Sequence, residues 1–132
     1  WNASRFVISN LSDYDGKKPI LNTKDKKTLI VFEKTKQKIT KNLENFKFSL
    51  AGEALYHYFW HTFADKIIEE MKNRIKENQD KKQAQYILDT ILKDCLKMLH
   101  PFMPFVTEAI WQKLPHYKNK KDNLLIITQW PQ

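Results

Sequence analysis

The amino-acid sequence predicts an all-α protein, and three observations lead to that fold class. Only 2 of the 132 residues are glycine and 5 are proline, too few for the many turns of an all-β chain. Apolar residues recur every three or four positions over long stretches, which is the period of an amphipathic helix. The length suits one domain, since roughly 100 to 150 residues is the commonest domain size. We therefore predict that residues 1–132 form one antiparallel bundle of four main helices plus a short fifth helix.

The first helix is expected at the opening residues, WNASRFVISN. This stretch has apolar side chains at Trp1, Phe6 and Val7 but no initiator Met and no capping residue before it. We therefore expect a piece of a longer protein that begins inside a helix. The residues that follow, SDYDGKKPILNT, have the composition of a loop.

A second helix is expected from a cap at Asn22 or Thr23 to about Asn45. At 100° per residue, two sets of side chains each fall within an arc of about 100° on this helix. The apolar set, expected in the core, is Leu29, Phe32, Ile39, Leu43 and Phe46. The other set, expected in solvent, is Lys24, Lys27, Lys34, Lys38 and Lys41.

Three further helices complete the predicted bundle. The third runs from about Leu50 to Ile75 and is apolar nearly all round in its first half, so it should be central there. The fourth has one apolar stripe, made by Ala84, Ile87, Leu88, Ile91, Leu92, Cys95, Met98 and Leu99. Pro101 ends it, and Pro104 suits the first turn of a fifth helix through about Lys113. A short extended segment is expected in the tail, NLLIITQWP.

The positive charge is concentrated in one quarter of the chain. The net charge is +8, and residues 17–47 hold ten lysines against three acidic residues. Such a segment on an otherwise neutral chain favours an anionic partner, of which nucleic acid is the commonest. A basic surface that only keeps the protein in solution is the alternative.

No residue pattern indicates catalysis or a metal site. His57, His61 and Asp65 share a helical face, but no Glu follows His57, so the metalloprotease pattern is absent. Cys95 lies on an apolar stripe and is expected to be a core residue, and the chain has no glycine-rich phosphate loop. Trp60, Trp111 and the stretch HPFMPFVTEAIW could stack on unpaired bases, but their helical spacing favours core packing.

Four segments together resemble a known family: WNASRFVISNL, ENFKFSLAGEALYHYFWHTFADKIIEE, LKMLHPFMPFVTEAIWQKLP and ITQWP. In order and spacing they are similar to the C-terminal helical anticodon-binding domain of class I aminoacyl-tRNA synthetases, most of all to the valyl branch. The family often has Ala-Asp-Arg-Trp where this chain has Lys24 to Lys27, so a lysine replaces an aromatic residue there. The family's ATP-binding motifs, His-Ile-Gly-His and Lys-Met-Ser-Lys-Ser, do not occur in this chain.

The resemblance implies that the chain binds the anticodon arm of a tRNA, that for valine. It implies no cofactor in this chain, while ATP and Mg would belong to a catalytic domain elsewhere in a longer, cytoplasmic enzyme. The expected partners are tRNA and that catalytic domain, with no membrane. Two alternatives stay open: the same domain from an isoleucyl or leucyl enzyme, and a helical protein-interaction module.

The RNA-binding surface is expected where the loop from Asn10 to Lys27 meets the turn from Arg74 to Lys82, because both lie at one end of an up-and-down bundle. Arg74 is the expected base contact, since its planar fork can stack and form paired hydrogen bonds. Lys113, Lys118 and Lys120 should lie toward the opposite end. The full set of predicted RNA-binding residues is Asn10, Lys17, Lys18, Lys24, Lys26, Lys27, Lys34, Lys38, Lys41, Arg74, Lys76, Lys81 and Lys82.

Overall fold

The computed structural model describes residues 1–115 and 123–132, and all regular elements in these ranges are helical. This confirms the predicted all-α class. The elements are α1 (Asn2–Asn10), α2 (Thr23–Glu44), α3 (Phe48–His57), the π-helix η1 (Tyr58–Ile67), α4 (Ile68–Lys76), α5 (Lys81–Leu99), α6 (Pro104–Trp111) and the 3₁₀ turn η2 (Leu125–Ile127).

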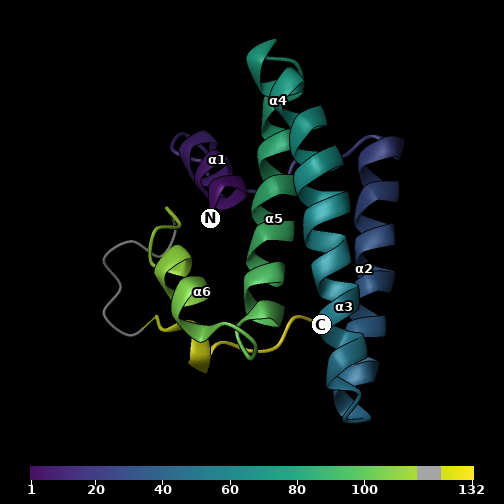
Figure 1. Cartoon of the computed structure of the whole chain (residues 1–132). Helices are drawn as coiled ribbons and strands as arrows, with labels where there is room; N and C mark the ends of the chain where they lie inside the picture. The colour runs from purple at the N-terminus through teal and green to yellow at the C-terminus, as the bar shows by residue number, and fades with distance from the viewer. Residues whose placement is uncertain (116–122) are drawn as a thin grey trace.

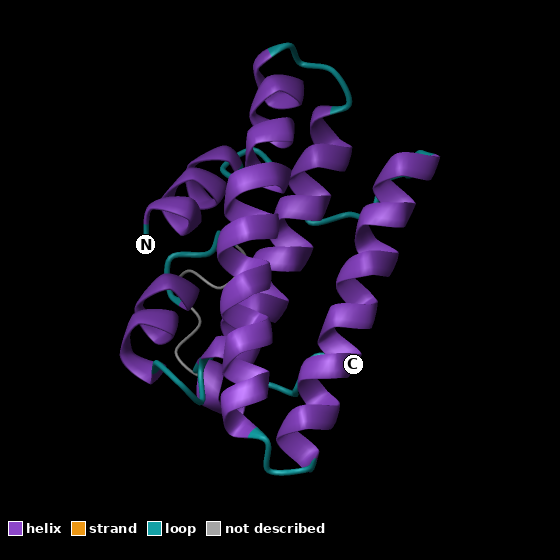
Figure 2. Ribbon diagram, turned by 45° about the vertical axis from the view of Figure 1, so that its right-hand side comes forward, coloured by secondary structure: helices purple, strands orange, loops and turns teal. Residues whose placement is uncertain are grey.

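Three long rods run antiparallel through the molecule (Figures 1 and 2). α2 is the first, α3, η1 and α4 together form the second, and α5 is the third. The short helices α1 and α6 both pack against α5 on the side away from α2. One cluster of buried apolar side chains joins all these helices, so the bundle surrounds a single core.

α5 lies at the centre of this core. Every apolar residue predicted for its stripe is buried, including Cys95 with 0% of its surface exposed. Trp111 of α6 is also buried, as the helical spacing predicts. No helix in the described part of the chain is long and apolar enough to cross a membrane.

The caps of α2 explain its bounds, which match the prediction within one residue. At its start, Asn22 Oδ1 accepts a hydrogen bond of 2.8 Å from the backbone N–H of Asp25. At its end, the N–H of Lys47 donates to the carbonyl of Asn42 at 2.8 Å, which closes a Schellman motif. Phe46 occupies the left-handed position of that motif with φ 57°. It is 80% exposed, so its prediction as a core residue is wrong.

The second rod contains a π-helical segment that the sequence analysis did not predict. One row of buried residues recurs every four positions along the whole rod: Ala51, Leu55, Phe59, Phe63, Ile67 and Met71. On an α-helix with 3.6 residues per turn, such a row drifts about 40° at each step and leaves the core side. The i→i+5 hydrogen bonds of a π-helix put more residues into each turn. The row therefore stays on the buried side.

Several aromatic residues predicted to be core lie at the surface. Trp60 is 44% exposed and Phe105 is 90% exposed. Helix α6 packs through Thr107, Ile110 and Trp111, so its opposite face is left uncovered within the described chain. Phe105 and Val106 lie on the uncovered part of α6, and Phe102 and Met103 are exposed just before it. The exposed apolar residues of the tail are Leu124, Ile126 and Ile127.

The tail returns to α2 and is fixed there by side chains. Its predicted extended segment is interrupted by the turn η2, and beyond it Trp130 Nε1 donates to Thr40 Oγ1 at 2.9 Å. Lys36 Nζ donates to the carbonyl of Gln132 at 2.7 Å and pairs with Asp94 at 3.0 Å. Burial opposes the charge of Lys36, but hydrogen bonds to Glu33 and Asp94 outweigh it and leave its pKa raised. Lys36 is therefore a structural lysine rather than a surface cation.

Candidate nucleic-acid interface

The two segments predicted to meet do lie together at one end of the bundle. Lys81 at the start of α5 pairs with Asp13 in the loop between α1 and α2. Gln85 Nε2 donates to the backbone carbonyl of Asn10 at 2.8 Å and to Asp13 Oδ1 at 2.7 Å. These contacts confirm that the first loop and the turn between α4 and α5 share one end.

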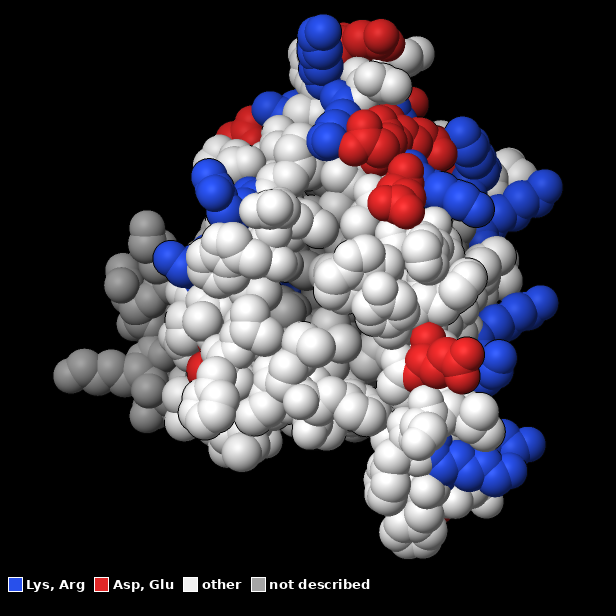
Figure 3. Space-filling model, viewed as in Figure 1, with Lys and Arg blue, Asp and Glu red and all other residues white. Residues whose placement is uncertain are grey.

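Acidic side chains at this end neutralise part of the positive charge. Lys24 Nζ lies 2.7 Å from Glu70, and Lys82 Nζ lies 3.7 Å from Asp15. Hydrogen bonds from Lys81 and Gln85 lower the pKa of Asp13, so this carboxylate is ionised at neutral pH. Figure 3 shows the result, with acidic and basic surfaces alternating over the upper end of the molecule. The charge excess predicted for this end is therefore smaller than the lysine count alone implies.

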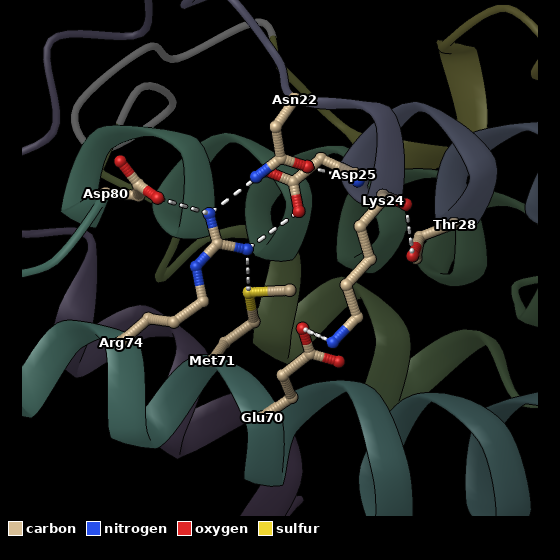
Figure 4. Close-up of polar contacts among 8 residues, drawn as sticks. All are labelled: Asn22, Lys24, Asp25, Thr28, Glu70, Met71, Arg74 and Asp80. Atoms are coloured by element: carbon tan, nitrogen blue, oxygen red, sulfur yellow. Dashed lines mark hydrogen bonds and ion pairs between the residues drawn. The ribbon is translucent and has the colours of Figure 1, made fainter.

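Arg74 is engaged in a buried ion pair (Figure 4). Its Nη1 and Nη2 atoms donate to the two carboxylate oxygens of Asp25 at 2.7 and 3.0 Å, and Asp80 lies 3.9 Å away. Asp25 is 1% exposed, and its hydrogen bonds raise the pKa of Arg74. To contact a base, the guanidinium of Arg74 would have to move away from Asp25. The Asp25 carboxylate would then be a buried charge without a partner, which costs free energy. The structure thus gives Arg74 a partner that the sequence-based prediction did not include.

The exposed lysines of α2 form a row that is not neutralised in this way. We call Lys27, Lys34, Lys38 and Lys41 the lysine face; all four are exposed and have no ion pair with any residue that the structure describes. At 1.5 Å per residue the row extends about 21 Å along the helix. Lysine side chains project from the right-hand edge of the molecule in Figure 3, where α2 lies. The arrangement offers a line of cations to an anionic strand.

The other predicted cations that lack an ion pair within the described ranges lie around the start of this row. They are Lys17, Lys18, Lys26 and Lys76, all exposed. Asn10 differs from them, because its side-chain amide donates to the carbonyl of Phe6 at 2.8 Å and its own carbonyl is held by Gln85. Toward the other end, Lys113 Nζ lies 5.8 Å from the centre of the Trp1 ring. Lys118 and Lys120 lie outside the described residues.

A groove separates the lysine face from the second rod. Val31, Lys38 and Asn42 line its α2 side, and Glu53 and His57 line the other side. Tyr58 forms part of the wall, 4% exposed, with its ring 5.1 Å from that of Phe32 at an interplanar angle of 27°. Burial raises the pKa of Tyr58, so its hydroxyl is neutral at physiological pH.

The histidines on this rod do not assemble a metal site in the described chain. His61 Nδ1 lies 3.6 Å from Asp65, and the rings of His57 and His61 are 5.1 Å apart. Among the described residues no three His, Cys, Asp or Glu side chains are grouped as metal ligands would be. Cys95, the one thiol of the chain, is buried, and burial raises its pKa, so it does not present a reactive thiolate.

Comparison with known proteins places this chain in a family. Residues 25–132 match the family described as the anticodon-binding domain of tRNA ligase. The whole chain is 40% identical over 135 residues to the valine--tRNA ligase of Fervidobacterium nodosum and 41% identical over 134 residues to that of Thermotoga maritima. The corresponding enzyme of Bacillus thuringiensis is 36% identical over 140 residues, covering 99% of this chain. The chain spans about 15% of the length of each of these relatives.

Proposed function

Since this chain belongs to the family of anticodon-binding domains of tRNA ligases, we propose that it binds the anticodon arm of a tRNA, that for valine. The observation that carries the proposal is the lysine face, a row of exposed cations without acidic partners in the described chain. RNA phosphates are the anionic array that such a row complements. The valine assignment is supported by the names of the relatives.

In the proposed complex, lysines and base contacts have separate tasks. Lys27, Lys34, Lys38 and Lys41 neutralise phosphates along α2, and the unpaired lysines of the first loop extend that row. These contacts fix the position of the RNA but do not read its sequence. Specificity then comes from unpaired anticodon bases, whose edges and faces are accessible in a loop. Arg74 and Asp25 act as a brace between α4 and the start of α2.

We further propose that the chain is one domain of a longer, cytoplasmic enzyme that attaches valine to tRNA with ATP. Its partners would be the tRNA and the catalytic domain of the same enzyme. The absence of both ATP-binding motifs from these residues supports a contribution of binding only. No catalytic step is assigned to any residue described above.

The test is a titration of the chain with anticodon stem-loops of valine, isoleucine and leucine tRNAs at several salt concentrations. We expect the valine stem-loop to bind most tightly and every affinity to fall steeply as salt rises. Tighter binding of the isoleucine or leucine stem-loop would instead assign the chain to the isoleucyl or leucyl branch of the family. Binding that is absent, or insensitive to salt, would contradict the proposal and favour a protein-interaction module.

A further inference from the structure

We propose that Tyr56 and Trp60 form a stacking platform for an unpaired nucleobase of the RNA strand whose phosphates lie on the lysine face. This inference rests on the proposed function and adds a base-binding element to it. The two residues lie where α3 continues into η1, on the side of the groove opposite α2.

The two rings already form a stack that is open to solvent. Their centroids are 4.9 Å apart and their planes differ by 19°. Tyr56 is 53% exposed and Trp60 is 44% exposed, although large aromatic side chains are usually buried. Neither the Tyr56 hydroxyl nor the Trp60 indole N–H has a hydrogen-bond partner in the described part of the chain. A flat apolar surface with free donors at its edge suits a nucleobase, which has a π-face and polar edges.

A series of ring contacts connects this platform to the groove. The ring of Tyr56 meets that of His61 edge-on at 6.3 Å, and His61 in turn lies 5.1 Å from His57. His57 lines the groove, and Lys38 lines it from α2. A strand on the lysine face therefore has His57 across the groove, and the platform is reached from His57 through His61.

The charges on the two sides of the groove determine how a strand would lie. On the α2 side Lys38 lines the groove and has no ion pair in the described chain, with Lys34 one turn before it, whereas Glu53 lines the other side. Phosphates are attracted to the first side and repelled by the second. The sugar-phosphate backbone is thus expected along α2, with a base directed across the groove toward Tyr56 and Trp60. Figure 3 shows both uncharged surface and an acidic patch next to the projecting lysines.

The surroundings of the platform favour RNA rather than a protein as its partner. An apolar protein surface would find a more exposed aromatic residue on α6, where Phe105 is 90% exposed, than on the platform, which lies near the charged lysine face. Trp60 also lies within the π-helical segment, and π-helical turns occur frequently at functional sites.

The experiment uses the valine anticodon stem-loop with 2-aminopurine at successive loop positions, since stacking quenches the fluorescence of this base. We expect one position to be quenched by the wild-type chain. Trp60→Ala should abolish that quenching and weaken binding about tenfold or more, which is the range for losing one base–aromatic stack. Trp60→Phe should retain most of both signals. Phe105→Ala is the control, because it removes an aromatic ring that is even more exposed from another face and should change neither.

Salt dependence separates this inference from the proposed function. Trp60→Ala should leave the slope of log affinity against log salt unchanged, because stacking releases no counterions. If Trp60→Ala, with its fold verified by circular dichroism, binds and quenches like the wild type while binding stays salt-dependent, the platform is refuted and the proposed function stands. If the wild-type chain binds no stem-loop, the proposed function fails and the platform fails with it.

Discussion

Asp25 and Arg74 are 49 positions apart in the sequence and form the most buried ion pair of the described chain. Arg74 was predicted to contact a base because of its planar fork and its place at the end of the bundle, and Asp25 was not considered as its partner. Nothing in the local pattern indicated that a carboxylate from the first turn of α2 would reach it. Periodicity predicts which face of a helix is buried, but it does not predict a charged pair that closes across two helices.

The first prediction concerns this pair. Asp25→Ala and Arg74→Ala should each lower the free energy of unfolding by about 3 kcal/mol or more, because removing one partner leaves a buried charge uncompensated. Urea denaturation measures the change. If Arg74→Ala leaves stability unchanged but abolishes binding of one stem-loop, Arg74 reads a base and the brace is the wrong interpretation.

The second prediction concerns pH. Burial raises the pKa of the Cys95 thiol, and burial raises that of Tyr14 to about 12. Both groups hold their protons more tightly in the folded chain than in the unfolded chain. The folded state is therefore fully stable below the pKa that each group has when unfolded, and it loses stability as pH rises above that value. Stability should therefore begin to fall near pH 8.5, the ordinary thiol value, and fall further above about pH 10.

Cys95→Ala is the control for this pH profile. It should remove the decline that starts near pH 8.5 while leaving the one above about pH 10. Thermal melting between pH 7 and pH 11 measures both onsets. Identical onsets in the wild type and Cys95→Ala would contradict the assignment to the buried thiol.

At the scale of the helices, regular patterns were predictable and local exceptions were not. Asn22 as a cap and the apolar stripe of α5 follow directly from residue type and spacing. The π-helical segment was missed because apolar residues spaced four apart also occur on one face of an ordinary α-helix. The difference appears only when the angular drift of the row around the helix is added up over several turns. The exposed face of α6 was missed because the helical spacing of its aromatic and aliphatic residues was taken as a sign of burial. Phe105 shows that a short helix can pack through one face only.

The third prediction concerns the turn after α2. Phe46 has φ 57°, a conformation that costs a residue with a Cβ about 1–2 kcal/mol. Phe46→Gly should raise the free energy of unfolding by about 0.5–1 kcal/mol, after allowing for the greater backbone entropy of glycine. Asn78 offers a matched control, because it has φ 52° in the same motif at the end of α4 but asparagine tolerates that conformation. Asn78→Gly should be nearly neutral, and equal effects of the two changes would refute the strain at Phe46.

At the scale of the whole molecule, chain direction predicted which segments meet, and the structure confirms that meeting. The acidic residues that meet there were not weighed, so Lys24, Lys81 and Lys82 were counted as free cations although each has a carboxylate partner. An up-and-down topology follows from loop lengths and helix order. Local charge balance depends on side chains from several segments and requires the structure.

The fourth prediction is that the chain has no aminoacylation activity and no valine-dependent exchange of pyrophosphate into ATP. The reason is that the family's two ATP-binding motifs are absent from its sequence. Both assays are run on the purified chain with full-length valine tRNA. Turnover that persists through repeated purification would contradict a purely binding role.

The proposed binding of RNA phosphates by the lysine face is tested most directly by one measurement. The affinity for the valine stem-loop is measured against salt for Lys27→Ala/Lys34→Ala/Lys38→Ala and for a control that removes the same charge elsewhere, Lys66→Ala/Lys97→Ala/Lys113→Ala. The first variant should bind more weakly and flatten the salt slope by up to about one unit per lost phosphate contact, while the control keeps the wild-type slope. Equal losses in the two variants, or a wild-type slope in the first, would contradict the proposal that RNA lies along α2.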